Sequence, residues 1–540
     1  MDQLQASSGS RAYVLRCAVV AALAGFLFGF DTIVISGADE RIQTIWSLDG
    51  FMHGLCMSAA LWGTVLGAMF GGWPTERFGR RKTLLWIGVF YFVSAVCSGI
   101  APEKNFFMIA RFIGGLGVGI ATVASPLYIS EISPPKLRGR LAGMFQFNIV
   151  FGILVAFVSN YLIEKAVDES IAWRWMLGVE AFPALLYTVL CFSIPESPRW
   201  LIVHGGKLEE GTDVFRKINP DSSDSEIHEL VNSVKASVGD RGTAAKFFTP
   251  RLRVPILLAF LIAAFNQLSG INAILYFAPR LLGLAGISNP LSASIGIGVT
   301  NLVFTFVGLW LIDRLGRRTL LYIGSIGYIV SLAVCAVAFL SYPGFRVVSS
   351  AIDVEKVVEQ MEKLDDAESP LSESDKQKIK DDYVDSRAVL ASSSAVQGYD
   401  GNAIEIADDA SLETVKGIAT DAKSEASSIL GAKKMVILLS IMAFIAAHAV
   451  GQGAVIWVFI SEIFPNRNRA AGQALGSFTH WLFAAVITLL FPIAIKQFDA
   501  GILFAFFCSM MCLQLLWVQF MVPETKAVPL EEIQKKLGIE

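Results

Sequence analysis

Residues Glu76–Thr83 read ERFGRRKT, and residues Asp313–Thr319 read DRLGRRT. Each stretch follows an apolar run and combines an acidic residue with clustered arginines. Two further motifs recur in the same order, SEISPPKLRGR (Ser130–Arg140) with SEIFPNRNR (Ser461–Arg469), and PESPR (Pro195–Arg199) with PETK (Pro523–Lys526). Three motifs repeated in one order predict that the chain is built from a duplicated unit.

The segments between these motifs are strongly apolar. Of the 540 residues, 54% are hydrophobic and 17% are charged, and the mean hydropathy is +0.56, which excludes an ordinary soluble protein. Runs of about 20 apolar residues are long enough to cross a bilayer as helices. These runs predict an all-α polytopic membrane protein with twelve transmembrane helices in two pseudo-symmetric six-helix halves. The runs are roughly 14–37, 54–74, 83–101, 107–130, 142–163, 174–195, 253–282, 291–312, 319–341, 435–460, 471–495 and 501–522.

The spacing of the repeated motifs reveals one large insertion. Arg77 and Glu131 are 54 positions apart, whereas Arg314 and Glu462 are 148 apart, an excess of 94. Composition places the extra residues at 342–434, where apolarity collapses and acids outnumber bases. We therefore expect five regions, which are 1–198, 199–250, 251–341, 342–434 and 435–540.

The basic residues indicate how the chain is oriented in its membrane. Lys and Arg gather after every second apolar run, and cytoplasmic loops are enriched in these residues. The first run shows no clear cleavage site and is expected to remain as helix 1. We therefore expect a multi-pass protein of the plasma or inner cell membrane with both termini cytoplasmic. Lys433 and Lys434 are mild exceptions.

By this topology, residues 199–250 lie on the cytoplasmic side and 342–434 on the other side. Apolar residues at helical spacing predict short amphipathic helices in the first segment. In the second they predict one or two, joined by the Ser/Gly-rich stretch Ala391–Asn402. The acidic insertion is either a cap over the outer vestibule or a solvated segment without a function of its own.

The soluble segments carry no recognisable enzyme motif. There is no Gly-rich phosphate loop, no nucleophile elbow and no metal-ligand spacing. Six of the seven cysteines lie within apolar runs and Cys56 begins one, so neither disulfides nor a zinc site are indicated. We expect no enzyme activity, no metal or other cofactor and no nucleic-acid partner.

The first apolar run contains GFLFGFDTIVISG (Gly25–Gly37), with Asp31 at roughly mid-membrane depth. A charge there costs on the order of 3 kcal/mol and needs a partner or a purpose. The surrounding glycines allow another helix to approach closely. Asp31 is therefore either an acid in a watery gap between helices or an ion-coupling site.

The repeated loops predict a breakable latch at the cytoplasmic side. Arginine forks can clamp carboxylates and the carbonyls at helix ends, and Glu131 and Glu462 are each followed by arginines. Topogenic charge is the simpler alternative. The latch residues are Glu76, Arg77, Arg80, Arg81, Glu131, Arg138, Arg140, Asp313, Arg314, Arg317, Arg318, Glu462 and Arg469.

Taken together, RFGRR with RLGRR, PESPR, PETK and the string QLSGIN (Gln267–Asn272) resemble the sugar porter family of the major facilitator superfamily. The resemblance covers essentially the whole chain except the insertion. It implies two parallel six-helix halves around a central site.

The resemblance also gives roles to the charges within the apolar runs. Asp31 matches the acid of proton-coupled sugar porters, where facilitative relatives usually have an asparagine. Arg111 matches the arginine that pairs with this acid, and Glu180 matches a second acid beside it. Such a cluster would satisfy all three charges, and protonation of one acid would loosen it. A static structural ion network is the alternative.

The residues that resemble the family's sugar site are mostly amides and aromatic side chains. Amides offer donors and acceptors to hydroxyl groups, and an indole covers the C–H face of a sugar. Alternatively, any one amide could simply join helices. The set is Gln146, Asn266, Gln267, Asn272, Asn301, Trp457, His480 and Trp481.

Some positions depart from the family pattern. Asn266 stands where a second glutamine is usual, and His480 replaces an amide found in many glucose or xylose carriers. His448 is also unexpected, and two histidines at comparable places resemble fructose-carrying facilitators, which lack Trp457. His480 is either a sugar ligand, a group that titrates near neutral pH, or a neutral hydrogen-bonded core residue.

These observations predict a monomeric carrier that imports a monosaccharide, of the hexose class, by proton symport and alternating access. The first alternative is a facilitator in which Asp31 is only structural. The second is a sugar sensor that binds without transport, but the tail after Pro523 is short for a signalling domain.

Overall fold

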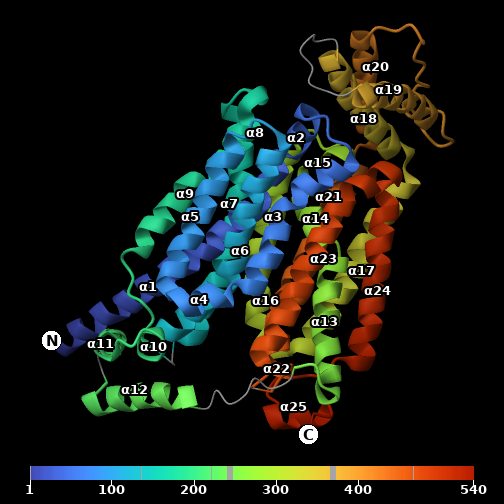
Figure 1. Ribbon diagram of the computed structural model, residues 1–540. Coiled ribbons are helices and arrows are strands. Elements are labelled where there is room, and N and C mark those ends of the chain that lie inside the picture. The colour runs from blue at the N-terminus through green and yellow to red at the C-terminus, as the bar shows by residue number, and fades with distance from the viewer. Residues whose placement is uncertain are drawn as a thin grey trace.

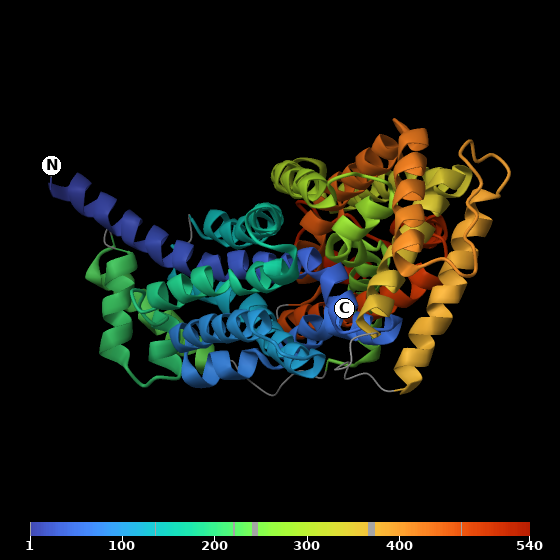
Figure 2. The same ribbon diagram turned by 90° about the horizontal axis from the view of Figure 1, so that it is seen from above.

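The computed structural model describes residues 2–134, 137–219, 222–239, 247–364, 373–465 and 467–539. Within these residues all regular secondary structure is helical. Figure 1 shows two groups of long helices side by side, the first blue to green and the second green to red. Seen from above, the two groups occupy opposite sides of the molecule (Figure 2).

The N-terminal half consists of residues up to the end of α9. Its helices are α1 (Asp2–Val34), η1 (Ile35–Gly37), α2 (Asp39–Ile45), α3 (Gly50–Phe70), α4 (Gly72–Phe78), α5 (Arg80–Gly99), α6 (Lys104–Ile132), α7 (Arg138–Ala166), α8 (Glu169–Gly178) and α9 (Ala181–Cys191).

The C-terminal half repeats this arrangement with two interruptions. Its helices are η2 (Pro250–Leu252), α13 (Arg253–Leu268), α14 (Ile271–Tyr276), α15 (Ala278–Leu284), α16 (Pro290–Leu315), α17 (Arg317–Ser341), α21 (Lys433–Val450), α22 (Gln452–Ile463), α23 (Arg469–Gln497) and α24 (Ala500–Met521). The break between α13 and α14 falls at Gly270, whose φ of 87° favours glycine. A second break falls at Gly451, between α21 and α22.

Eleven helical segments in the described residues are long and apolar enough to cross a membrane. They correspond to eleven of the twelve predicted runs. The remaining run, 174–195, is divided between α8 and α9 by a turn at Val179 and Glu180, so neither helix alone reaches spanning length. The sequence did not predict this break, which places Glu180 at the start of α9.

Glycines set the closest approaches between helices, as the sequence predicted for α1. A Cβ atom on Gly29 would lie 1.9 Å from the carbonyl oxygen of Ile149 on α7, and one on Gly25 would lie 2.6 Å from that of Phe145. Small residues allow such backbone contact within a membrane. The helix that carries Asp31 is therefore pressed directly against α7.

The remaining helices lie at the two ends of the bundle. Helices α18 (Pro343–Leu364), α19 (Glu373–Ser394) and α20 (Leu412–Leu430) form the insertion at one end, which we call the insertion face (Figure 1). The sequence predicted one or two helices there, and the described residues of the insertion contain three. Helix α19 extends to Ser394, into the stretch that was expected to be a linker.

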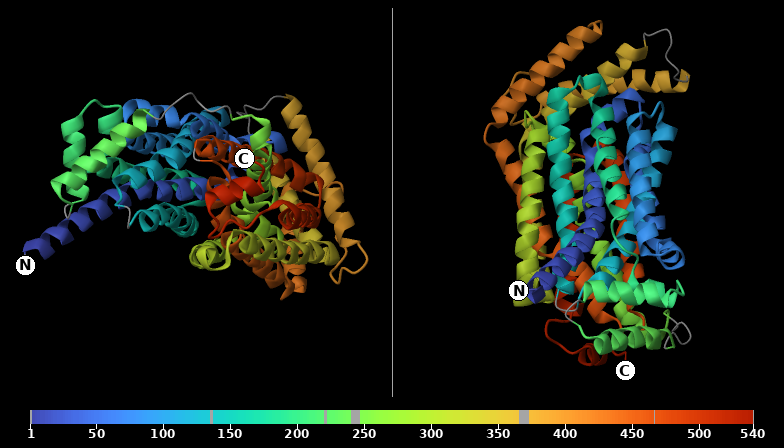
Figure 3. Two further views of the ribbon diagram at one scale, coloured as in Figure 1. Left: turned by 90° about the horizontal axis from the view of Figure 1, so that it is seen from below. Right: turned by 90° about the vertical axis from the view of Figure 1, so that its left-hand side faces the viewer.

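The opposite end is called the linker face. Helices α10 (Pro198–Val203), α11 (Leu208–Ile218) and α12 (Asp224–Gly239) lie there beneath the N-terminal half, and α25 (Leu530–Lys536) lies beneath the C-terminal half (Figure 3). Helix α11 buries Val214, Phe215 and Ile218 on one face, as its amphipathic spacing predicts.

The closest backbone contact between the halves lies toward the insertion face. A Cβ atom on Gly54, near the start of α3, would lie 1.9 Å from the carbonyl oxygen of Leu489 on α23. Gly298 on α16 approaches α7 less closely, because an added Cβ atom would lie 3.1 Å from the Cα atom of Leu154. The closer contact, at Gly54, lies near the insertion-face end of α3, so the two halves are closed together at that end.

Candidate functional site

An ion pair lies in the middle of the N-terminal half. Nη1 of Arg111 on α6 donates to Oδ1 of Asp31 on α1 at 2.6 Å, and Nη2 donates to the backbone carbonyl oxygen of Asp31 at 2.9 Å. Each residue is only 1% exposed. A buried charge is tolerated when it is paired and hydrogen-bonded, which is the arrangement found here.

Glu180 lies beside this pair and is also 1% exposed. Asp31 and Arg111 are the charged groups that interact with it electrostatically. Among the described residues, neither of its carboxyl oxygens has a hydrogen-bond partner. A buried carboxyl group without a donor is held most cheaply as the neutral acid. The three residues named by the sequence are therefore brought together, but only Arg111 and Asp31 form a direct pair.

Two tyrosines that the sequence reasoning missed complete this cluster. Tyr91 on α5 and Tyr276 on α14 are fully buried and interact electrostatically with Asp31 and Arg111. Tyr276 belongs to the C-terminal half, so it connects the ion pair to the helix that follows Gly270. Aromatic residues in apolar runs look like ordinary core, and the sequence contains no signal that distinguishes these two.

A second cluster lies in the middle of the C-terminal half. Nε2 of Gln267 on α13 is 3.1 Å from Nε2 of His480 on α23 and donates to Oδ1 of Asn266 at 3.0 Å. The imidazole of His480 packs against two indoles, with ring centroids 5.3 Å from Trp457 and 4.8 Å from Trp481. Five of the eight predicted substrate residues therefore form one contiguous group.

Polar atoms of this group, and of Asn272 on the adjacent helix α14, have no partner. Oε1 of Gln267, Nε1 of Trp481 and Nδ2 of Asn272 on α14 are buried without a hydrogen bond to any described residue. Leaving a buried donor or acceptor unpaired costs about 1–3 kcal/mol. One acceptor and two donors on neighbouring elements are the groups that a polyhydroxylated ligand could satisfy.

The other two predicted residues are less closely connected. Asn301 on α16 is buried, whereas Gln146 on α7 is half-buried. No hydrogen bond or ring contact recorded among the described residues joins either of them to Gln267 or His480. His448, which the sequence flagged as unusual, lies within 2.7 Å of the hydroxyl of Tyr328 through its Nδ1 atom. That hydrogen bond fixes one ring nitrogen of His448 against α17.

The first repeated motif forms an ionic lock at the linker face. Arg80 donates from Nε and Nη2 to the two carboxyl oxygens of Glu131 at 2.9 and 3.0 Å. Glu196 accepts from the backbone N–H groups of Arg80 and Arg81 at 2.9 and 3.1 Å, and so caps the start of α5. Burial raises the pKa of Glu196 although these backbone donors oppose the shift.

The second copy reproduces this lock almost atom for atom. Arg317 donates from Nε and Nη2 to both oxygens of Glu462 at 3.1 and 2.8 Å. Glu524 accepts from the backbone N–H groups of Arg317 and Arg318 at 3.0 and 3.1 Å. The preceding glycines match as well, because Gly79 and Gly316 have φ values of 99° and 91°.

The remaining latch candidates contribute less to these locks. The sequence paired Glu131 and Glu462 with the arginines that follow them, but their partners are Arg80 and Arg317, which start α5 and α17. Asp313 is 3.6 Å from Arg317, and Arg314 lies over the ring of Trp310. No ion pair within the described residues involves the other candidates, and the side chain of Arg138 lies outside them. These others are Glu76, Arg77, Arg140 and Arg469.

Both locks join helices of the same half. The RFGRR lock connects α5, α6 and the segment after α9, and the RLGRR lock connects α17, α22 and the segment after α24. Within the described residues, no ion pair crosses between the halves at the linker face. In this conformation the locks therefore rigidify each half and do not tie the two halves together.

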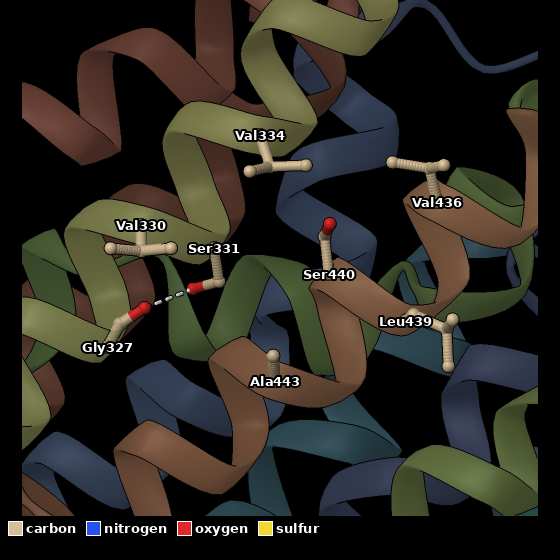
Figure 4. A pocket seen from close by; sticks show the side chains of 8 residues that line it. All are labelled: Gly327, Val330, Ser331, Val334, Val436, Leu439, Ser440 and Ala443. Carbon is tan, nitrogen blue, oxygen red and sulfur yellow. Dashed lines mark hydrogen bonds between the residues drawn. The ribbon is translucent and has the colours of Figure 1, made fainter.

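A surface hollow of about 410 Å³ lies between α17 and α21, away from both central clusters (Figure 4). Its lining is almost entirely apolar, and Val330 and Leu439 are each 58% exposed. Ser331 points into this region but donates its hydroxyl to the carbonyl of Gly327. The hollow faces outward from the bundle and is separate from the candidate site.

Comparison with known proteins identifies the group to which the chain is similar. The model of the "Sugar (and other) transporter" family matches residues 17–351 and 412–537, which leaves most of the insertion outside it. The arabinose-proton symporter of Bacillus subtilis is 28% identical, covering 98% of this chain and 96% of that protein. The protein named probable inositol transporter 2 of Arabidopsis thaliana is 31% identical, covering 97% and 91%.

Among solved structures, the fold is similar to the inward open conformation of the xylose transporter XylE from Escherichia coli. The TM-score is 0.72 and the identity 29%, with 97% of this chain and 100% of that chain covered.

Proposed function

The chain belongs to the sugar transporter family of the major facilitator superfamily, a family of transporters and not of enzymes, and on this premise we propose that it imports a monosaccharide of the hexose class together with protons. The observation that carries the proposal is the buried Asp31–Arg111 pair with Glu180 beside it. A carrier without ion coupling has no need of this charge in its core.

The geometry suggests how a proton could act in this cluster. Protonation of Asp31 would remove the charge that Arg111 satisfies, and Glu180 is the neighbouring carboxyl group without a donor. We propose that Arg111 then turns toward Glu180, so that one arginine serves two acids in alternation. Because Tyr276 stands next to Asp31 and Arg111, the rearrangement is passed to α14.

Sugar recognition is assigned to the opposite half. The unpaired atoms of Gln267, Asn272 and Trp481 would bind hydroxyl groups, while Trp457 would cover an apolar face of the ring. Gln146 and Asn301 would contribute after the halves move around the sugar. Since Asn272 and Tyr276 lie on the same short helix, the sugar and proton sites share α14 as a moving part.

We propose that the linker face is cytoplasmic, with both termini there, and that the insertion face is extracytoplasmic. The arginine-rich locks at the linker face support this orientation, because cytoplasmic loops are enriched in basic residues. The structure, closed at the insertion face and similar to an inward open transporter, would then be the state that releases sugar inside. A single chain contains both proposed sites, so we propose that it acts as a monomer in the cell membrane.

The available driving force is sufficient for accumulation. A proton contributes about 1.4 kcal/mol per pH unit and about 2.3 kcal/mol per 100 mV. A tenfold sugar gradient costs about 1.4 kcal/mol. One proton per sugar therefore supports a gradient on the order of a hundredfold.

The test uses the purified chain in liposomes with an inward proton gradient. Wild-type protein is expected to concentrate sugar, whereas Asp31→Asn should exchange labelled for unlabelled sugar without concentrating it. Substrates to compare are D-glucose, D-fructose, D-xylose, L-arabinose and myo-inositol, the last because one relative is named an inositol transporter. Concentration of sugar by Asp31→Asn would overturn the coupling role, and absence of accumulation by the wild type would favour a facilitator.

A further inference from the structure

The ion pairs that join the two halves gather at the insertion face. Nε of Arg280 on α15 donates to Oδ2 of Asp39 on α2 at 2.7 Å, and Nη2 donates to Oε1 of Gln43 at 2.7 Å. Nε2 of His53 on α3 lies 2.6 Å from Oδ1 of Asp39. Arg280 belongs to the C-terminal half, whereas Asp39, Gln43 and His53 belong to the N-terminal half.

This cluster is buried and its acid is ionised. Asp39 is 1% exposed and His53 is fully buried. Burial alone raises the pKa of Asp39, but the nearby Arg280 and His53 outweigh it and lower the pKa to about 2. If the halves separated here, Arg280 would leave while His53 stayed with Asp39, so the acid would keep one partner.

The insertion adds a second layer of contacts between the halves. Glu359 on α18 accepts from Nη1 of Arg41 on α2 at 2.7 Å, and Lys356 lies 3.7 Å from Glu40. Lys363 donates to the carbonyl oxygen of Thr44 at 3.4 Å. On α19, Lys378 lies 3.2 Å from Asp49, which caps α3. Every one of these contacts has an insertion residue on one side and the N-terminal half on the other.

The insertion itself is anchored to the C-terminal half. It leaves from α17 and returns to α21, and α18 buries Val354 and Val358 within the molecule. Ser427 of α20 donates to the carbonyl oxygen of Gly286, just after α15, at 2.9 Å, and Lys496 on α23 pairs with Asp382 on α19 at 3.0 Å. The insertion is therefore an extension of the C-terminal half, above which it lies in Figure 1, and its α18 and α19 contact the N-terminal half.

From this arrangement we infer that Asp39, His53 and Arg280 form the gate at the insertion face, and that α18 and α19 act as a strap that holds this gate closed. The inference rests on the alternating access of the proposed function. Opening this face requires the Asp39–Arg280 pair and all four strap contacts to break together. The strap thus shifts the conformational balance toward the state that is open at the linker face.

The strap is tested by hydrogen–deuterium exchange on the full-length purified protein without sugar. The strap variant combines Lys356→Gln, Glu359→Gln, Lys363→Gln and Lys378→Gln, all at partly exposed side chains. Partly exposed pairs are individually weak, so together they are expected to raise the open population on the order of tenfold. Amides in residues 35–45 and 278–284 should exchange faster by that factor, and amides around the two locks should exchange more slowly.

The matched control removes an ion pair that lies entirely inside the insertion. Lys416 and Glu362 are 3.3 Å apart on α20 and α18, and Lys416→Gln with Glu362→Gln should leave exchange at both faces unchanged. The inference is supported if amide exchange becomes faster at the insertion face and slower at the linker face in the strap variant but not in the control. Equal exchange in strap and control variants, or faster exchange at the insertion face without protection at the linker face, overturns it.

The gate is tested by Arg280→Gln. This variant should speed amide exchange at the insertion face and slow it at the linker face, and both changes should be larger than in the strap variant. If that protein does not fold, Asp39→Asn combined with Arg280→Gln removes the charge pair without leaving either partner unpaired. No reciprocal shift in the variant that folds would exclude the gate. These exchange measurements need no proton gradient, so their failure is distinguishable from failure of proton-coupled transport.

Discussion

The two halves have the same architecture at the linker face and different chemistry at their centres. Each half repeats the lock of arginine, glutamate and helix cap, with Arg80 and Glu131 in one copy and Arg317 and Glu462 in the other. At mid-depth, the N-terminal half buries an ion pair and a second carboxyl group. Apart from Arg253 and Arg280 near the two ends of 253–282, the apolar runs of the C-terminal half contain no Asp, Glu, Lys or Arg, and they bury amides, imidazoles and indoles.

On the proposed function, this difference would separate the response to protons from the recognition of sugar. Because Asp31 and Arg111 belong to the same half, their pair would not have to break when the halves rock, and a proton would loosen it without any domain movement. The unpaired amides of the other half would respond to a hydroxylated ligand. The two copies of one scaffold would then have separate roles.

The largest effect on the difference between the halves is expected when Arg111 loses its charge. Arg111→Leu leaves Asp31 buried without its partner, at an expected cost of about 3–5 kcal/mol. Thermal unfolding of the purified protein measures the loss, with the exposed Arg140→Ala as the control. A stable Arg111→Leu protein that still concentrates sugar would show that the N-terminal half does not depend on this pair.

The amide cluster is tested by Gln267→Ala, which removes the side chain that connects Asn266 and His480. Loss of a buried polar contact to sugar is expected to weaken binding about 10- to 100-fold, or about 1.4–2.8 kcal/mol. Titration of sugar binding to purified protein measures the change. The ratio of accumulated sugar at saturating concentration should be unchanged, and a parallel loss of coupling would contradict the division between the halves.

The arginine–glutamate locks that the two halves share are tested by Arg80→Lys and Arg317→Lys. Lysine cannot form the two parallel hydrogen bonds of a guanidinium with a carboxylate, so each change should cost about 1–2 kcal/mol in unfolding. The Arg80 change should be the larger, because Glu131 is 7% exposed in its side chain and Glu462 is 26% exposed. The opposite order would mean that burial does not set the strength of these locks.

The smallest expected effect concerns His480. Its ring contacts Gln267 and lies between Trp457 and Trp481, as expected for a neutral, hydrogen-bonded side chain. His480→Gln restores the amide common in the family and should change sugar affinity by only about 2- to 3-fold, a difference of less than about 1 kcal/mol. Binding measured at pH 6 and pH 8 should be equal for both proteins, and a pH-dependent wild type would show that His480 titrates.

Sequence reasoning was most informative where placing a residue type in its surroundings costs free energy, as a charge does among apolar residues. Asp31, Arg111 and Glu180 stand out because charges in apolar runs are rare, and the glycines around Asp31 predicted a close helix contact, although not that α7 would make it. Tyr91 and Tyr276 carried no such signal, although they flank the ion pair. The break at Glu180 was also missed, although Gly178 directly precedes the turn and Pro183 cannot donate a backbone hydrogen bond to the carbonyl of Val179.

Pairings between distant residues were the hardest to predict. Glu131 was paired with arginines a few positions away, but its partner Arg80 is 51 positions away, and Glu196 of the PESPR motif completes the lock. Arg41 and Glu359 are separated by 318 positions, and nothing in either local sequence indicates the other. Charge patterns showed where ion pairs would form, whereas only the folded arrangement of helices determines which residues meet.

The position of the helix-capping glutamates has a consequence for how the chain is made. Glu196 follows α9 directly, and Glu524 follows α24, so each lock receives its last member as its own six-helix unit is completed. A ribosome that has delivered Ser197 has delivered every residue of the first lock. Because domains generally fold as units during synthesis, the N-terminal half can assemble in the membrane before the C-terminal half exists.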